Sequence, residues 1–367
     1  MRIALTLLIA LHGIIHLFGF FKAFGISEFN AISQPVSKTF GVFWGLAFLL
    51  FAITIVLMFM HSDYWWLGGF LAVGLSQILV FNYWSDAKFG TIANAIILLA
   101  IIIGYANFNL KNKINRERQV LFENSQVKEE VITEKTLQDL PPIVRKWLTG
   151  SGVIGKRVIS NVFLIQELQL KMNPEQTSWN KGTATQLFTI EPPAFNWHME
   201  THMNVVLSVS GNDIFEARQG GMTIKLLSLF PVATVQNDEK INQATLQRYL
   251  AEMVWFPSAA LSPYITWEAI DDHAARAIMD YNGTKGSGEF YFDKDGNFEK
   301  FVSLRYRDAR DAEPTKWIVS ATKIEERNGI KTPIECEASW ELEQGAWTWL
   351  KLKITDIQYN VKEMPKP

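Results

Sequence analysis

The sequence predicts a bundle of four membrane-spanning helices followed by a mostly antiparallel β domain, a curved sheet or open barrel crossed by one helix. Only seven of the 35 basic and 37 acidic side chains fall in residues 1–110, so the first third is far more apolar than the rest. Beyond Gly155 apolar and polar residues alternate, which is the period of a half-buried strand. We therefore expect a transmembrane domain at 1–110, a charged helical stalk at 111–135 and a soluble β domain at 136–367.

Uncharged apolar runs define the first domain. Each has 19 or 20 residues, and at about 1.5 Å per residue such a helix spans the roughly 30 Å hydrocarbon core of a bilayer. The four runs are Ile3–Phe21, Gly41–Met60, Trp65–Tyr83 and Gly90–Phe108.

The distribution of basic residues predicts the orientation. An even number of spans places both chain ends on one side, and that side holds Arg2, Lys111, Lys113, Arg116 and Arg118. The opposite side holds only Lys22, Lys38 and Lys88. Because cytoplasmic segments carry the excess of Lys and Arg, we expect an integral membrane protein with a cytoplasmic β domain.

Polar side chains within the spans need partners, because hydrocarbon offers no water. His12 and His16 share one helix face, and Gln77 and Asn94 lie in the third and fourth runs. Hydrogen bonds between helices are the simplest explanation. A metal or haem site, or a proton path, is the alternative, although two histidines without a mid-span carboxylate supply few ligands. We therefore expect no cofactor.

Alternation and turn residues predict about ten strands, joined as antiparallel hairpins because no helices intervene between most of them. One helix is expected at 242–255, with Asn242 as its N-cap, lying across the concave face of the sheet. A shorter one is expected at 140–150, between Pro141-Pro142 and Gly150. The strands are expected at 164–172, 183–190, 195–203, 205–210, 274–281, 288–293, 298–307, 316–325, 332–342 and 347–359.

Arg248 and Glu252 are four residues apart on the predicted helix 242–255. If exposed, they form an ordinary surface ion pair. If buried, Glu252 beside Asp271 or Asp272 acts as an acid or base, or Arg248 binds a carboxylate or phosphate. The sequence leaves these interpretations open.

His198, Glu200 and His202 alternate along one predicted strand and therefore share a face. Two imidazoles at this spacing can bind one metal ion, but a further ligand is needed. The solvent-exposed face of a half-buried strand has the same pattern, so we expect no metal here.

Composition and missing motifs narrow the function. A net charge of −2 argues against nucleic-acid binding, and the single Cys336 excludes an internal disulfide. Motifs of serine hydrolases, P-loop and dinucleotide-binding proteins and zinc proteases are missing. Tryptophan is abundant in the soluble part, where such rings fill a core or line an apolar cavity. Trp197, Trp255 and Trp267 are the candidates for such a lining.

One segment carries a family resemblance. Gln247-Arg-Tyr-Leu-Ala-Glu-Met-Val-Trp-Phe-Pro257, followed by Ile265-Thr-Trp267 and Asp271, resembles an uncharacterised bacterial membrane-protein family with an Arg-Tyr-Leu-x-Glu…Trp-x-Pro motif. The resemblance implies the architecture but no established active site. It marks residues at which to look: Arg248, Glu252, Trp255, Trp267 and Asp271.

Three functions follow as hypotheses. The first is a membrane-anchored protein whose β domain binds an apolar or amphiphilic, lipid-like ligand near the bilayer, through Arg248, Glu252 and the three tryptophans. The second is an enzyme that uses Glu252 and Asp271 as acid and base on a membrane-associated or anionic substrate. The third is a non-catalytic scaffold whose sheet edge binds a partner protein.

Overall fold

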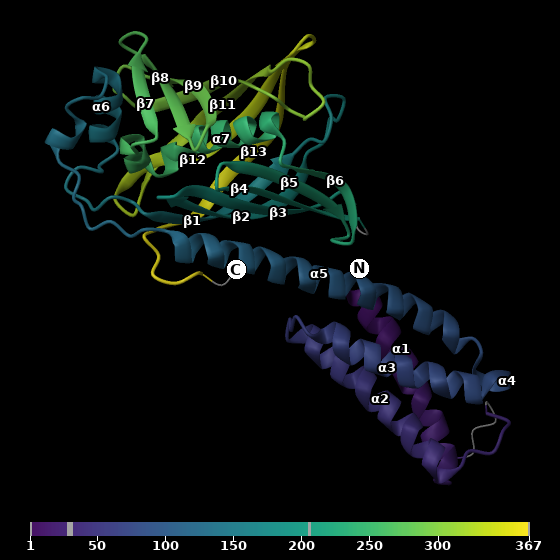
Figure 1. Cartoon of the computed structure of the whole chain (residues 1–367). Helices are drawn as coiled ribbons and strands as arrows, with labels where there is room; N and C mark the ends of the chain where they lie inside the picture. Colours follow the sequence, from purple (N-terminus) through teal and green to yellow (C-terminus); the bar gives the residue numbers. More distant parts are fainter. Residues whose placement is uncertain (1, 28–31, 205–206, 366–367) are drawn as a thin grey trace. The chain divides into compact units, whose positions relative to one another are not determined.

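The computed structural model describes residues 2–27, 32–204 and 207–365, which form two compact units (Figure 1). The first contains Met1–Asn112 together with Leu227–Leu229, and the second contains Lys113–Leu226 and Phe230–Pro367. Each has its own hydrophobic core.

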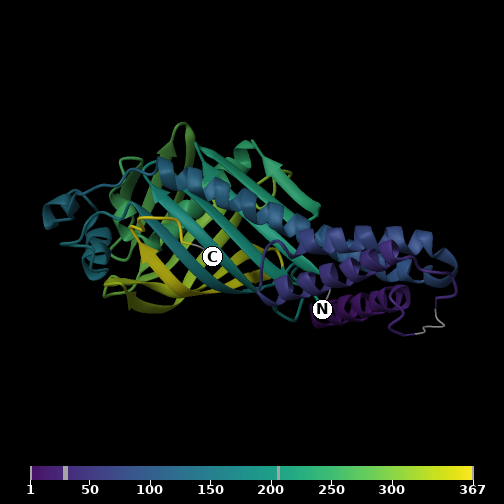
Figure 2. The same ribbon diagram turned by 90° about the horizontal axis from the view of Figure 1, so that it is seen from below.

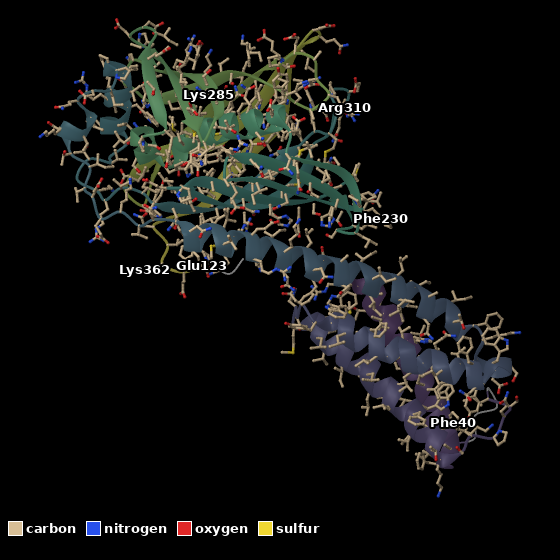
Figure 3. All side chains as sticks on the ribbon, viewed as in Figure 1. Phe40, Glu123, Phe230, Lys285, Arg310 and Lys362 are labelled. Carbon is tan, nitrogen blue, oxygen red and sulfur yellow. The ribbon has the colours of Figure 1, made fainter. Side chains whose placement is uncertain are left out.

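Helices form the first unit, and four of them are long and apolar enough to cross a membrane. Only 22–33% of their apolar windows is buried within the bundle, so large apolar side chains remain exposed around it. Their side chains are mostly carbon, whereas nitrogen and oxygen atoms crowd the second unit (Figure 3). A helix that is apolar all round suits a lipid environment. The elements are α1 (Arg2–Ala23), α2 (Lys38–Phe59), α3 (Trp65–Asn82), the short α4 (Trp84–Ala87) and α5 (Gly90–Asn124).

The charged segment predicted as a helical stalk is helical only in its first part. Helix α5 ends at Asn124, and the following segment is extended because its backbone pairs with the chain beside it: Gln126 N–H donates to the Glu191 carbonyl at 2.8 Å. The last turns of α5 pack on the sheet through Leu121, which contacts Phe163 and Leu187 in a small buried cluster. The helical prediction for 125–135 is therefore wrong, except for the short 3₁₀-helix η1 (Glu134–Leu137).

The described part of the second unit contains one antiparallel sheet of thirteen strands (Figure 1, Figure 2). Consecutive strands are neighbours, except that β1 pairs with β13 at the middle and leaves β6 and β7 at the two edges. The sheet is curved and open, which confirms the predicted fold class. The strands are β1 (Asn161–Leu170), β2 (Asn180–Ile190), β3 (Pro193–His202), β4 (Ser208–Glu216), β5 (Gln219–Leu226), β6 (Phe230–Gln236), β7 (Ile265–Ala269), β8 (Ala274–Tyr281), β9 (Thr284–Phe292), β10 (Phe298–Arg305), β11 (Thr315–Arg327), β12 (Ile330–Leu342) and β13 (Gly345–Tyr359).

The prediction of about ten strands was three short. Strand β5 was missed because its glycines hide the alternation, β6 because Pro231 interrupts an exposed edge strand, and β7 because it has only five residues. Of the strand predicted at 205–210, residues 205–206 lie outside the described part of the chain, and β4 begins at Ser208.

Helix α7 (Glu239–Glu252) lies between the two arms of the curved sheet and contacts β5 on one side and β9 on the other (Figure 1). Close approach requires glycine on both strands, because a Cβ at Gly220 would lie 2.4 Å from Thr245 Oγ1 and one at Gly286 would lie 2.8 Å from Gln247 Cγ. The predicted N-cap was wrong: Asp238 accepts from the backbone N–H groups of the first turn, while the Asn242 side chain accepts from Gly220 N–H.

The core fills the space between α7 and the concave face of the sheet. Helix α6 (Pro142–Gly150), the helix predicted at 140–150, also contributes buried residues to this core. The 3₁₀-helices η2 (Met253–Trp255) and η3 (Pro257–Leu261) contribute buried residues as well.

Candidate functional site

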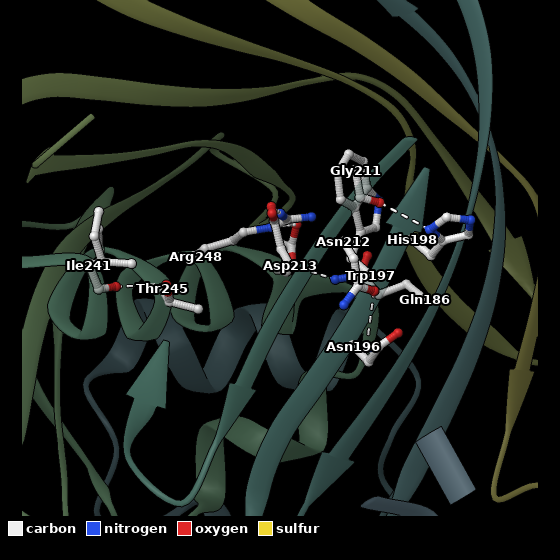
Figure 4. A network of polar contacts seen from close by, with 12 residues as sticks. Gln186, Asn196, Trp197, His198, Gly211, Asn212, Asp213, Ile241, Thr245 and Arg248 are labelled. Atoms are coloured by element: carbon white, nitrogen blue, oxygen red, sulfur yellow. Dashed lines mark hydrogen bonds and ion pairs between the residues drawn. The ribbon is translucent and has the colours of Figure 1, made fainter. Parts of the chain in front are cut away.

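Arg248 of α7 lies beside Asp213 of β4 (Figure 4), and together with Glu252 these residues form a buried ion-pair cluster. Arg248 Nε donates to Glu252 Oε1 at 2.8 Å, and its Nη1 donates to Asp213 Oδ2 at 2.5 Å. The side chains are 12%, 10% and 23% exposed for Arg248, Glu252 and Asp213, so the surface-pair interpretation does not describe them. Burial of charged groups is costly, and the ion pairs of Arg248 with both carboxylates offset part of this cost.

A chain of amide hydrogen bonds continues the cluster across three strands. Gln186 Nε2 donates to Glu252 Oε2 at 2.8 Å, Gln166 Nε2 donates to Gln186 Oε1 at 3.2 Å, and Trp197 Nε1 donates to Gln166 Oε1 at 2.9 Å. The Trp197 ring in turn lies 4.6 Å from the Arg248 guanidinium carbon, a cation–π contact. Both carboxylate oxygens of Glu252 and one face of the Arg248 guanidinium group are therefore in contact with protein groups.

The interior shifts the acidity of these groups. Burial raises the pKa of Glu252 and Asp213, and the positive charge of Arg248 opposes this rise. For Arg248, burial lowers the pKa, but the two carboxylates outweigh it and the net direction is upward. Burial, reinforced by the negative charge of Glu252, raises the pKa of the Cys336 thiol to about 12. The cluster lies in a poorly hydrated interior.

Arg305, at the end of β10, is a second cation beside this cluster. Its Nε donates to the Ala244 carbonyl of α7 at 2.8 Å, and its guanidinium carbon lies 4.6 Å from the Trp317 ring and 5.6 Å from the Trp340 ring. It forms no ion pair with any described residue, and its two terminal nitrogens have no hydrogen bond within the described ranges. Burial, with a smaller effect of Arg248, lowers its pKa to about 10, so it stays cationic at neutral pH.

Trp317, Trp340 and Trp347 lie opposite one another on β11, β12 and β13, and we call them the tryptophan ladder. The first two are buried with ring centroids 6.2 Å apart, whereas Trp347 is half-buried and packs at the border of the core. The indole N–H groups of Trp317, Trp347 and the neighbouring Trp349 are buried without a hydrogen-bond partner in the described part of the chain. Such groups are rare in folded proteins and call for an explanation.

The other predicted site residues lie elsewhere. Trp255 is 2% exposed, and its Nε1 donates to the Pro333 carbonyl, so it is part of the packed core. Trp267 packs on Phe290 at 5.1 Å and donates to the Ala260 carbonyl. Asp271 lies in the exposed turn after β7, and its carboxylate accepts from the His273 backbone N–H. The acidic neighbour that acts on Glu252 is Asp213, not Asp271.

Sequence reasoning missed Arg305, although a signal was present. Along β10, Phe301, Ser303 and Arg305 alternate onto the core-facing side, and a charged residue at such a position is unusual. Asp213 was missed for a different reason: its partner Arg248 is 35 residues away, and only the placement of α7 over β4 brings the two together.

His198, Glu200 and His202 share a strand face but make separate contacts. His198 Nδ1 lies 3.1 Å from the Gly211 carbonyl oxygen and therefore carries a hydrogen, while its Nε2 lies 3.5 Å from Glu200 Oε1. His202 is exposed at the end of β3. Within the described residues, no group of three or more His, Cys, Asp or Glu side chains is placed to hold a metal ion.

The polar residues predicted within the spans come together around Ser76 of α3. His12 Nε2 lies 3.1 Å and His16 Nε2 lies 2.9 Å from Ser76 Oγ, and Asn94 Nδ2 donates to the same oxygen at 3.0 Å. Asn94 also donates to Gln77 Oε1 at 3.0 Å. The side chains of His12, His16, Ser76 and Asn94 are each at most 5% exposed.

The hydrogen bonds of this network fix the form of each histidine. His16 Nδ1 lies 2.8 Å from the His12 carbonyl and must donate, so its Nε2 accepts the Ser76 hydroxyl hydrogen. Ser76 Oγ then serves as an acceptor for His12 and Asn94, and His12 Nε2–H also reaches Asn94 Oδ1 at 2.9 Å. Two neutral imidazoles satisfy all these contacts, which is what hydrogen bonding between helices requires.

A groove of about 820 Å³ lies over β1, β2, β12 and β13. Its charged residues alternate along the strands with core-facing ones such as Leu168, so they belong to the opposite face of the sheet. Three lysines and three glutamates line it, namely Lys181, Lys351, Lys353, Glu167, Glu335 and Glu337. The balance of charge gives this groove no preference for an anion or a cation.

Fold and site together define an open antiparallel sheet, wrapped around one helix, with a buried charged cluster and a tryptophan ladder inside. The chain belongs to a family of unknown function (DUF6920), whose model matches residues 138–359, and this confirms the resemblance to an uncharacterised family. No curated protein matches the chain. Among solved structures, the chain is similar to a LolA superfamily protein from Nitrosomonas europaea, at 8% identity and a TM-score of 0.30, over 64% of this chain and 96% of that chain.

Proposed function

We propose that the β domain binds an apolar or amphiphilic, lipid-like ligand at the half-buried end of the tryptophan ladder, in a protein that four helices anchor to a membrane. The observation that carries this proposal is the ladder itself, which runs from the buried Trp317 to the half-buried Trp347 at the border of the core. Rings used only as core filling have no need of a partly open end.

The surroundings of Trp347 support an apolar ligand. Half-buried apolar side chains of β12 and of β13 itself pack against the same core: Leu342, Trp349 and Leu352. Burying such surface under a ligand contributes about 25 cal/mol per Å². A chain-like apolar molecule would cover these residues.

Binding can be tested with full-length protein in nonionic detergent, titrated with an uncharged pyrene-labelled fatty alcohol. We expect saturable binding that Trp347→Ala weakens about tenfold, as loss of a large contact residue does. Trp179→Ala is the matched control, because Trp179 lies on the β1–β2 connection against Lys171 and Lys351. The absence of saturable binding, or equal weakening by both variants, would contradict the proposal.

For the location we propose a bacterial inner membrane with the β domain in the cytoplasm. The support is the excess of basic residues next to Phe108, at Lys111, Lys113 and Arg116, over those of the loops on the other side. A reporter that is active only in the cytoplasm, fused after Pro367, should be active. Activity of a periplasm-specific reporter at the same position would reverse the orientation.

One observation favours the scaffold hypothesis as a second candidate. Strand β6 is an edge strand, and Phe230 and Val232 on it are 57% and 68% exposed. Unpaired edges with apolar side chains are sites at which a partner strand can add. Phe230→Lys combined with Val232→Lys should abolish capture of such a partner without affecting binding of the pyrene probe.

A further inference from the structure

We infer that the ligand of the β domain carries an anionic oxygen head group, carboxylate or phosphate, which Arg305 and the indole N–H group of Trp317 bind. This inference rests on the proposed function and names the chemical class of its ligand.

The first support is the number of donors without acceptors. Trp317, Trp347 and Trp349 each present a buried indole N–H with no partner in the described part of the chain, and the terminal nitrogens of Arg305 add further donors beside Trp317. An unpaired buried donor costs about 1–3 kcal/mol. Trp317 lies on β11 beside Arg305, whereas Trp347 and Trp349 both lie on β13, so a head group at Arg305 would supply the acceptor that the Trp317 N–H lacks.

The second support is the division of charge between the two arginines. Arg248 is already bound by two carboxylates, Asp213 and Glu252, which use its Nε and Nη1. Arg305 uses only its Nε, for the carbonyl of Ala244. Of the two guanidinium groups, Arg305 is therefore the one that has no carboxylate paired with it and no described hydrogen bond on either terminal nitrogen, and guanidinium is well suited to bind carboxylate or phosphate oxygens.

The third support is the fixed position of Arg305. The guanidinium lies over two indole rings, at 4.6 Å and 5.6 Å, and its Nε is bonded to α7. A cation held in this way loses little conformational freedom when a ligand binds. The same rings lead to the half-buried Trp347, so a head group at Arg305 would leave its chain along the ladder.

The test uses competition against the pyrene probe on full-length protein in nonionic detergent. Dodecanoate and dodecyl phosphate should displace the probe at about tenfold lower concentration than dodecanol and methyl dodecanoate, which have the same chain without the charge. Inorganic phosphate, which has no chain, should not displace it. A preference for only one of the two anions would identify which head group the site takes.

Single substitutions then test which side chains cause the preference for anionic competitors. Arg305→Met should remove the tenfold advantage of the anions and leave dodecanol unchanged, whereas Arg276→Met, an exposed arginine on β8, should retain it. Because Arg305 is partly buried, the melting temperature of Arg305→Met is measured together with its binding. Trp317→Phe provides a second variant. It keeps a smaller aromatic ring under Arg305, removes the indole N–H, and should weaken the anions about threefold.

The outcomes separate the two proposals. Equal displacement by dodecanoate and dodecanol in the unaltered protein, or an unchanged anion preference in both variants, overturns the anionic head group and leaves the proposed function standing. Failure of the pyrene probe itself to bind overturns both.

Discussion

The two units of this protein each bury a network of polar side chains, and the networks differ in one respect. Around Ser76 the described groups are neutral, and the hydrogen bonds of His12, His16 and Asn94 pair consistently. In the β domain the cluster around Arg248 is charged, and beside it Arg305 has donors without acceptors.

This difference leads to different expectations for the two networks: the neutral one holds helices together, and the proposed ligand would meet the unpaired donors beside the charged one. A closed neutral network contributes stability and fixes the pairing of helices, and it leaves nothing for a ligand to satisfy. A network with unpaired donors loses stability until another molecule supplies acceptors. We expect the ion pairs of the charged cluster to contribute stability to the β domain, and the neutral network to hold the helices together.

The largest effect is expected for Arg248→Met. The substitution leaves Asp213 and Glu252 buried side by side without their cation, and removing one partner of a buried ion pair costs about 3–5 kcal/mol. Denaturant unfolding of the β domain within the full-length protein, followed by far-UV circular dichroism, measures the loss. Arg276→Met, which removes an exposed pair with Glu289, should leave the curve in place. Similar curves for the two variants would show that the cluster is not buried as described.

The next effect concerns Cys336, the single cysteine. With a pKa of about 12 it holds about a thousandfold less thiolate at pH 8 than an ordinary thiol, and only the thiolate reacts. Because the thiol form persists until the pH approaches 12, labelling by iodoacetamide should remain slow at pH 8 and rise about tenfold per pH unit. The same protein in denaturant is the control, and equal labelling rates in both states would show that the interior is open to water.

A smaller effect is expected for Ser76→Ala in the helical unit. The change removes the hydroxyl that His12, His16 and Asn94 share and should lower the free energy of unfolding in mixed micelles by about 2 kcal/mol. Thr54→Val is the matched control, because the Thr54 hydroxyl bonds only to the Leu50 carbonyl of its own helix. If Thr54→Val costs as much as Ser76→Ala, the network does not hold the helices together.

The sequence predicts the elements of this fold better than it predicts the site. Length and hydropathy predict the long apolar helices, since each corresponds to one unbroken apolar run, and the alternation of apolar residues predicts most strands. The gathering of His12, His16, Gln77 and Asn94 was predictable because few polar groups occur in the spans. The contact of Arg248 with Asp213 was not, because it depends on how far α7 enters the curved sheet, which Gly220 and Gly286 determine.

The smallest effect is expected for Asp271→Asn, which tests whether the second hypothesis, acid–base catalysis with Glu252, has support. Asp271 is exposed, and its oxygen accepts from the His273 N–H, a bond that an amide oxygen can also make. Stability should therefore change by no more than about 0.5 kcal/mol, and binding of the pyrene probe should not change. Asp213→Asn is the contrasting variant, since it removes the charge that meets Arg248. If Asp271→Asn impaired ligand binding as much as Asp213→Asn, the site would extend to the β7–β8 turn, and the division between the buried cluster and the exposed turn would have to be redrawn.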